Sequence, residues 1–381
     1  MKLKTTMVFA IGLIVLGSLP VIAKTMTAES LVFCSDLQAR SANLLFEPKK
    51  ILKIQRANQS QVFEEGIDFT VNGRTLKLTD DSRIPVLQYF RDTKDSKLYR
   101  FKEPAGFIYS PGGVKKHNDY DIEVSYEYGE GDYDAFFKNC GQSDSLHVFE
   151  KLKTGEPVCV AFLGDSISVG AQASGAFLLK AKPNRPGYTK LVFNALQKHY
   201  PDTPMRYLNQ SSGGKTTTWA LTQAPALAAE KPDLLVLAFG MNDATGARIS
   251  SRTYLQNTRK LVRMFREANP NSSILLVAEF SPNPNLKQFA QPALRKANRD
   301  ELFALQKELE NCAVVDVGSV TRPIVARKKF CDVSGNNVNH PNDFLHQVYA
   351  DAVLRVLKEN LSSANLAQRG ATADKINGKK N

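Results

Sequence analysis

After residue 23 the sequence contains no hydrophobic run long enough to cross a bilayer, which takes about 20 consecutive apolar residues. It also lacks zinc-finger spacing, an aromatic RNA-binding signature and a basic helix of the kind that reads DNA. No internal repeat is present, and the histidines show no metal-ligand spacing to one another or to cysteines. We therefore expect no stable membrane insertion, no nucleic-acid partner, no metal and no cofactor.

The N-terminal 23 residues resemble a targeting signal. Lys2 and Lys4 form a basic start, residues 7–19 form an apolar core of about a dozen residues, and small residues precede position 24. We expect residues 1–23 to be a cleaved signal peptide, with an uncleaved anchor as the alternative. The mature protein would then be exported, to a periplasm or outside the cell.

The formal net charge is +12, and loss of the two leader lysines would leave +10. A basic protein favours anionic partners such as an acidic polysaccharide. A solvated basic surface without a specific anion site is the simpler alternative.

Five cysteines are present, so at least one thiol must stay unpaired within a monomer. Cys159 lies within an apolar run and is expected to be buried and inert. Exported proteins can form disulfides. We expect the pairs Cys34–Cys140, near the two ends of a first domain, and Cys312–Cys331, which flank a strand and the loop after it.

Residues 24–155 have the rhythm of an all-β domain. Residues 122–128 alternate between apolar and polar side chains, and Asn72-Gly73 is a strong tight-turn signal between two β-branched runs. Other strand candidates are residues 51–54, 69–71 and 75–78. A meander of this kind closes most naturally as a β-sandwich.

Residues 156–361 alternate between apolar strands and helical segments, which indicates a parallel sheet covered by helices on both faces. The expected strands are residues 158–163, 205–208, 234–239, 274–280 and 313–317. The expected helices are residues 188–199, 251–268, 293–310 and 344–361. Residues 362–381 are polar and are expected to be a disordered tail.

Four distant residues follow predicted strands or lie in late loops, where parallel sheets bind ligands. Ser166 could be a nucleophile, His340 its base, and Gly214 and Asn242 donors to an oxyanion. Three of them also have a plain structural interpretation: Ser166 as a helix N-cap, Gly214 as a turn glycine and Asn242 as a turn asparagine. Asp165 is expected to hold the turn by accepting backbone N–H groups.

The four segments together resemble the blocks of the SGNH (GDSL-type) hydrolase family: Gly164-Asp165-Ser166, Gly214, Gly240-Met241-Asn242-Asp243 and His340-Pro341-Asn342-Asp343. This resemblance covers roughly residues 156–360 and implies a flavodoxin-like, three-layer α/β/α domain with metal-free ester hydrolysis. By motif match, Ser166 is the nucleophile, His340 the base, and the Ser166 N–H, Gly214 and Asn242 form the oxyanion hole.

One position departs from the family pattern, because the residue three before the histidine is Asn337 where an aspartate is usual. An amide can orient an imidazole but cannot stabilise the imidazolium by charge. Three arrangements stay open: Ser-His-Asn through Asn337, a dyad steered by a backbone carbonyl, or an acid such as Asp332 from elsewhere.

An alternative assignment takes Asp343 as the catalytic acid and His346 as the base. We prefer His340, because Asp343 is expected to cap the last helix and its closeness to His346 would follow from helix geometry alone.

An exported β-rich domain before such a hydrolase domain resembles the layout of carbohydrate esterases with an N-terminal jelly roll. The resemblance implies removal of O-acetyl groups from a carbohydrate. The alternatives are an O-acyltransferase acting on a polysaccharide, a lipase or thioesterase, and a carbohydrate-binding protein that has lost activity.

Overall fold

The computed structural model describes residues 24–34, 40–87, 99–103, 106–109, 119–129, 131, 133–141, 146–176 and 179–357. The predicted signal peptide (1–23) and tail (362–381) lie outside these residues and stay predictions, as does the domain limit at residue 155. Within the described ranges, no helix has the length and apolar character needed to cross a membrane.

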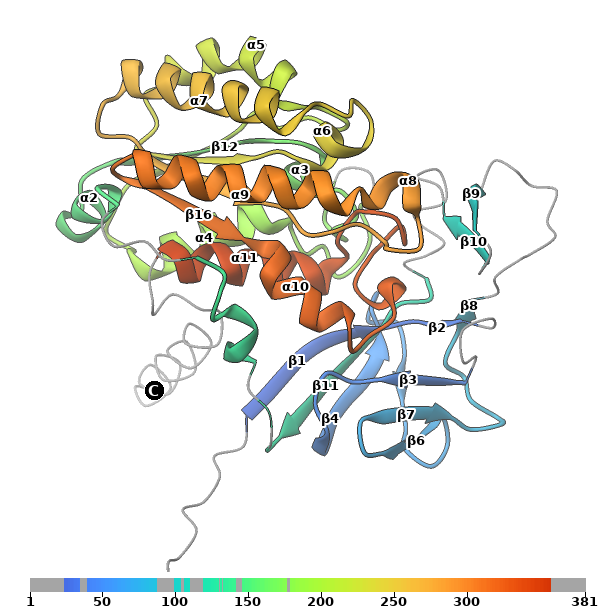
Figure 1. Cartoon of the computed structure of the whole chain (residues 1–381). Helices are drawn as coiled ribbons and strands as arrows, with labels where there is room; N and C mark the ends of the chain where they lie inside the picture. Colours follow the sequence, from blue (N-terminus) through green and yellow to red (C-terminus); the bar gives the residue numbers. More distant parts are fainter. Residues whose placement is uncertain are drawn as a thin grey trace, which may run out of the picture.

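The N-terminal region is built from strands, as the sequence predicted, and most of them lie below the α/β domain in Figure 1. Its larger sheet is antiparallel, in the order β1 (Lys24–Leu31), β11 (Ile122–Tyr128), β4 (Pro48–Arg56) and β5 (Val62–Phe63). A second antiparallel sheet contains β3 (Ser41–Asn43), β7 (Thr75–Leu78) and β6 (Phe69–Asn72). The N-terminal region also contains two separate strand pairs: β2 (Phe33–Cys34) with β8 (Val86–Leu87), and β9 (Tyr99–Glu103) with β10 (Gly106–Tyr109).

Local sequence explains these strands. The alternation predicted at residues 122–128 places Val124, Tyr126 and Tyr128 in the core. The Asn72-Gly73 signal is confirmed, because Asn72 pairs with Thr75 across a two-residue turn in which Gly73 has φ +54°. Glycine adopts that left-handed conformation without the steric cost that a Cβ imposes.

The second domain is confirmed as a parallel α/β sheet. Its order is β13 (Met205–Asn209), β12 (Val158–Gly164), β14 (Leu234–Ala238), β15 (Ser273–Ala278) and β16 (Cys312–Asp316), with all neighbours parallel. Numbered within the domain, this is the flavodoxin-like order 2-1-3-4-5. The chain reverses direction of winding between β12 and β14, so a crevice is expected beyond their carboxyl ends.

Helices cover both faces of this sheet (Figure 1). One layer consists of α5 (Thr217–Ala228), α7 (Ser251–Ala268) and α9 (Pro292–Glu308). The other consists of α4 (Tyr188–His199), α10 (Val317–Val325) and α11 (Asp343–Leu357). The remaining elements are short: α2 (Val148–Thr154), α3 (Ser166–Val169), α6 (Met241–Thr245), α8 (Lys287–Ala290), and the 3₁₀ turns η2 (Asp134–Phe137) and η3 (Phe330–Asp332).

The two domains share one continuous apolar core, which contains Tyr126 of β11 as well as Val348 of α11. Polar contacts reinforce this junction. Lys328 forms an ion pair with Glu29 in which both side chains are fully buried. The Val32 N–H donates to Asp332 Oδ1 at 2.8 Å. The segment before His340 is thereby attached to the β domain.

The predicted disulfide pairs are wrong. All five cysteines are free thiols, and Cys34 Sγ lies 3.6 Å from Cys331 Sγ in a small buried cluster between the domains. Because Cys34 and Cys331 are neighbours, neither Cys34–Cys140 nor Cys312–Cys331 can form in this fold. Cys159 is buried as predicted.

Candidate active site

Ser166 stands at the turn between β12 and α3, where the sequence predicted it. Asp165 caps the short helix, since its Oδ1 accepts the Ile167 N–H at 2.9 Å. A Cβ added at Gly164 would lie 2.6 Å from the carbonyl oxygen of Ala238, so this sharp turn requires a glycine. The turn leaves Ser166 half-buried at the carboxyl end of the sheet.

His340 reaches Ser166 from the far end of the chain. Its Nε2 lies 2.9 Å from Ser166 Oγ, within hydrogen-bond distance. Burial, together with the smaller effect of nearby His346, lowers the pKa of His340 to about 4. The imidazole is therefore neutral at pH 7, which is the state that a general base requires.

His340 belongs to a tight loop that closes on itself. An antiparallel bridge joins Ser334 to Pro341, and Ser334 Oγ and the Gly335 N–H both donate to the His340 carbonyl. The buried Asn336 side chain fills the inside of the loop. Its Nδ2 lies 3.2 Å from His340 Nδ1.

Asn336, rather than Asn337, is therefore the residue next to the imidazole, and the predicted role of Asn337 is corrected. The backbone of Asn337 is left-handed (φ +52°), and its side-chain Oδ1 accepts from Asn283 at 3.3 Å. The loop bends at this residue, so the amide four positions before His340 takes the place expected for the one three before it.

Asp332 does not supply the missing acid. Its two carboxylate oxygens accept the backbone N–H groups of Val32 and Lys329. Of the three arrangements left open by the sequence, a histidine accompanied by an asparagine is the one observed, but through a different asparagine.

The turn predicted to carry an oxyanion donor passes directly in front of Ser166. A Cβ added at Gly213 would lie 3.8 Å from Ser166 Cβ. Gly214 is exposed with φ +73°, a conformation that favours glycine. Within the described residues its N–H has no hydrogen-bond partner. It is thus available to a ligand, and its role as an oxyanion donor stays a prediction.

Asn242 lies on α6, directly after β14 and therefore beside the nucleophile's strand. Its Nδ2 donates to Asp165 Oδ2 at 3.2 Å and to the Lys215 carbonyl at 3.0 Å. Both amide hydrogens are engaged in the free protein, so a contact with an oxyanion requires sharing or release of one bond. The predicted role of Asn242 also stays a prediction.

Two charged side chains fix the start of α6. Glu279 Oε2 accepts the Met241 N–H at 2.6 Å, while Arg295 donates to the Met241 carbonyl at 3.2 Å. Burial raises the pKa of Glu279 well above its usual value and that of Asp165 to about 7. Glu279 and Arg295 thus hold Met241, the residue next to Asn242, from both sides.

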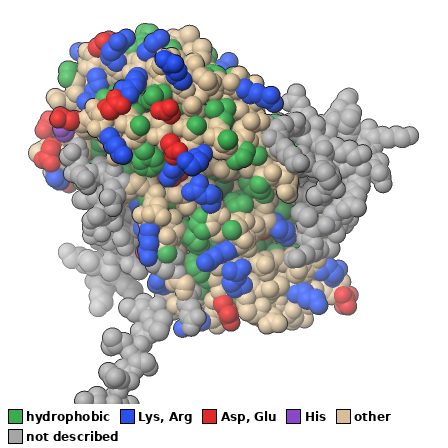
Figure 2. Space-filling view, in the orientation of Figure 1, with side chains coloured by type: hydrophobic (Ala, Val, Ile, Leu, Met, Phe, Trp, Pro, Cys, Tyr) green, Lys and Arg blue, Asp and Glu red, His purple; other side chains and the backbone are tan. Residues whose placement is uncertain are grey.

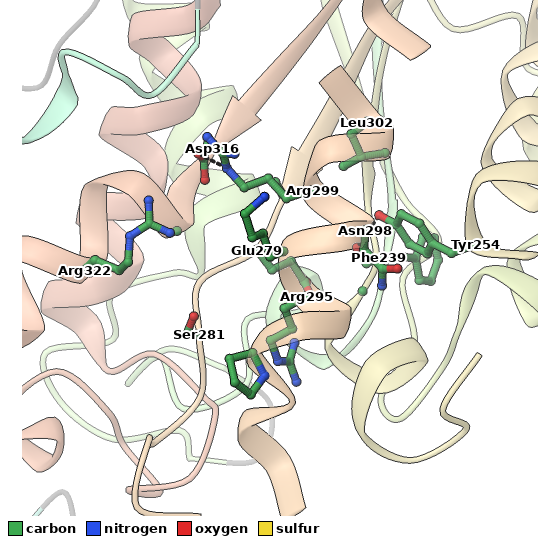
Figure 3. A pocket seen from close by; sticks show the side chains of 15 residues that line it. Phe239, Tyr254, Glu279, Ser281, Arg295, Asn298, Arg299, Leu302, Asp316 and Arg322 are labelled. Carbon is green, nitrogen blue, oxygen red and sulfur yellow. Dashed lines mark hydrogen bonds and ion pairs between the residues drawn. The ribbon is translucent and has the colours of Figure 1, made fainter. Parts of the chain in front are cut away.

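A hollow of about 330 Å³ opens beside this cluster, at the carboxyl ends of β14, β15 and β16. Figure 3 shows Arg299 directed at Asp316 on one side, with Phe239, Tyr254 and Asn298 on the other. The hollow borders Glu279 and Arg295, but its lining contains neither Ser166 nor His340. In the described part of the chain, no group of three His, Cys, Asp or Glu side chains could hold a metal ion.

His346 is excluded as the base by its own contacts. It is fully buried, its Nδ1 accepts the Tyr188 N–H at 3.3 Å, and its Nε2 donates to the Ala171 carbonyl at 3.0 Å. Asp343 does not cap α11, in contrast to the prediction. The helix begins at Asp343 itself, so the preceding Asn342 takes that position and its Oδ1 accepts the Leu345 N–H.

Comparison with known families agrees with this geometry. Residues 162–348 match the sequence model of the GDSL-like Lipase/Acylhydrolase family. The α/β domain belongs to this family. The match runs from the strand before Ser166 to the helix after His340, so the GDSL-like domain contains every residue of the candidate site.

Solved structures with similar folds include a two-domain esterase (CEX) active on acetylated mannans, with 24% identity and a TM-score of 0.45 over 57% of this chain and 52% of that one. A mutant of Axe2, an acetylxylan esterase from Geobacillus stearothermophilus, has 20% identity and a TM-score of 0.43 over 52% and 94%. TesA has 20% identity and a TM-score of 0.41 over 53% and 98%.

The chain thus spans about half the length of the two-domain esterase. These similarities are too distant to carry an argument about substrate. No curated protein sequence matches the chain.

Proposed function

We propose that this GDSL-like hydrolase is an exported serine esterase that removes O-acetyl groups from a carbohydrate through an acyl-serine intermediate. The observation that carries the proposal is the 2.9 Å contact between Ser166 Oγ and His340 Nε2. A nucleophile next to a neutral imidazole at the end of a parallel sheet is the arrangement that acyl transfer needs.

The reaction begins when Ser166 Oγ attacks the ester carbonyl and His340 Nε2 takes the hydroxyl proton. The oxyanion of the tetrahedral intermediate lies near the exposed turn at Gly214, whose N–H can donate to it. His340 returns the proton to the leaving sugar oxygen, and a water activated by the same ring then hydrolyses the acyl-serine.

The surface around the site favours a short acyl group. Among the described residues, only four large apolar side chains are exposed: Leu52, Val62, Ile67 and Val169. Of these, only Val169 belongs to the GDSL-like domain. The turn that passes in front of Ser166 in space contains no apolar side chain at Ser212, Gly213 and Gly214. A long acyl chain would find little exposed apolar surface there.

Support for a carbohydrate comes from the predicted export and from the resemblance of the two-domain layout to carbohydrate esterases. On the face drawn in Figure 2, Lys and Arg side chains are spread over both domains and do not form one patch. A dispersed basic surface suits an extended acidic glycan better than one small anion.

The test is acetate release from acetylated xylo- and manno-oligosaccharides, run beside acetyl and long-chain model esters. We expect acetate release and a preference for acetyl esters, with both lost in Ser166→Ala. A preference for long-chain esters would favour a lipase or thioesterase. Analysis of the products with an acceptor sugar present separates hydrolysis from transfer.

A further inference from the structure

The orientation of the Asn336 amide is fixed by its surroundings. Its Oδ1 accepts the backbone N–H groups of Val338, Asn339 and His340 at 2.9 to 3.0 Å. An NH₂ group in that position would point its hydrogens at three N–H donors. The oxygen must therefore lie inside the loop.

The other end of the amide, which is an NH₂ group, consequently faces the catalytic imidazole. Nδ2 carries two hydrogens and no acceptor. One hydrogen bonds to Asn339 Oδ1 at 3.1 Å, and the other points at His340 Nδ1, 3.2 Å away. A donor at this distance requires a lone pair on Nδ1, which in a neutral ring leaves the proton on Nε2.

We infer that Asn336 is a positioning residue that holds His340 in the Nε2–H tautomer, so that the resting site is restrained from deprotonating Ser166. In this tautomer the ring donates to Ser166 Oγ, and Nε2 has no lone pair to accept the hydroxyl proton. This inference rests on the proposed function, because it concerns the same serine and histidine.

Entry into the reaction then requires a change in the loop. The proton must move from Nε2 to Nδ1, where it would face the NH₂ group of Asn336. Rotation of the amide by half a turn would relieve that clash, but it would break the bonds from three backbone N–H groups. Asn336 is only 1% exposed, so water cannot readily replace them.

Substitution Asn336→Asp removes the restraint with almost no change of shape. One carboxylate oxygen keeps the contacts inside the loop, and the other accepts from a protonated Nδ1. In serine proteases, asparagine in place of the triad aspartate gives the wrong tautomer and lowers kcat by about 10⁴-fold. We expect the reverse substitution here to raise kcat for ester hydrolysis by about 10²- to 10⁴-fold.

Asn339→Asp is the matched control. Asn339 lies in the same loop and accepts from the same Nδ2, so the variant adds the same charge next to the same amide. The carboxylate at position 339 bonds to Asn336 and not to the imidazole. We expect the tautomer of His340 to be unchanged and activity to stay close to that of the native protein.

The direct readout is ¹⁵N NMR of the histidine rings in the full-length protein at pH 7, with the His340 signals assigned by His340→Gln. His346 serves as an internal reference, because its Nδ1 accepts a backbone N–H and its Nε2 donates to a carbonyl. We expect an unprotonated Nδ1 for His340 in the native protein and in Asn339→Asp, and a protonated Nδ1 in Asn336→Asp.

A protonated Nδ1 in the native protein would overturn the inference, whatever the esterase activity. A second result would also overturn it: the native protein hydrolyses the ester, the tautomer changes in Asn336→Asp, and the variant hydrolyses the ester no faster than the native protein. If the tautomers are as expected and no variant hydrolyses any ester, the assignment of the tautomer stands and the proposed function fails.

Discussion

Lys328 and Glu29 form a fully buried ion pair that joins the segment before His340 to the first strand of the β domain. Glu29 also accepts from the Tyr126 hydroxyl and the Leu45 N–H, so its carboxylate is held by three donors. Just after His340, Asn342 Nδ2 donates to Ser30 Oγ at 3.0 Å. The β domain thus anchors the loop that carries the candidate base, in addition to any role in binding.

Removal of the ammonium by Lys328→Met should destabilise the protein by about 3–5 kcal/mol, because it leaves Glu29 charged and buried without its partner. Denaturation in urea measures this change. Arg259→Ala is the control, since Arg259 and Glu308 form an exposed pair that contributes about 1 kcal/mol or less. Equal losses in the two variants would contradict the structural role of the buried pair.

Cys34 and Cys331 should form a disulfide when the protein is incubated with oxidised glutathione, by exchange that releases two molecules of reduced glutathione. The sulfurs are 3.6 Å apart and need to approach to about 2.05 Å. The bond should add about 2–4 kcal/mol to the free energy of unfolding. Peptide mapping without reductant identifies the pair, and Cys331→Ser is the control. A Cys34–Cys140 or Cys312–Cys331 peptide would contradict the fold.

The two histidines near the site should respond differently to substitution. His340→Ala should abolish measurable ester hydrolysis and leave the free energy of unfolding nearly unchanged, because the ring is half-buried at the surface of the loop. His346→Gln should keep activity, since glutamine can replace both the acceptor and the donor of the buried ring. Loss of activity in His346→Gln with a stable fold would favour the rival assignment.

The pH dependence of stability should reflect His346, whose pKa is lowered by burial from 6.5 to about 4. The unfolded chain takes up a proton near pH 6.5 and the folded chain only near pH 4, so stability falls as the pH drops through this window. The loss attributable to this group is about 3 kcal/mol at full protonation. In His346→Gln, the free energy of unfolding should depend less steeply on pH between 6.5 and 4.

Ester hydrolysis should stay active down to low pH, so that the acidic limb of its pH profile lies well below pH 6.5. The native enzyme needs a neutral His340, and its lowered pKa of about 4 keeps the ring neutral well below pH 6.5. Measured kcat/KM should therefore fall only as the pH approaches 4. In Asn336→Asp the new carboxylate favours the imidazolium, which moves the limb to higher pH. An unchanged limb in the variant would show that residue 336 does not contact the ring.

Regular elements were predictable wherever local patterning is strong. Helices α4 and α7 have the predicted limits, and β11 matches the alternating run at residues 122–128. Helices α5 and α10 were missed. Each contains an internal proline, Pro225 or Pro323, and proline normally argues against a helix interior.

The meeting of Ser166 with His340 was predictable from the order of four motifs, but the partner of the imidazole was not. Asn336 and Asn337 are adjacent and chemically identical, and the loop bend at Asn337 decides which one faces His340. The proximity of Cys34 and Cys331 arises from the docking of two domains and leaves no trace in sequence spacing. Tertiary geometry determined both results.

The role of Ser166 as the nucleophile is tested by the intact mass of the protein after treatment with a fluorophosphonate, which phosphonylates an activated serine. We expect one label on Ser166, none in Ser166→Ala and almost none in His340→Ala, with faster labelling in Asn336→Asp. Absence of label at Ser166 in a folded protein, in both the native form and Asn336→Asp, would show that Ser166 is not an activated nucleophile.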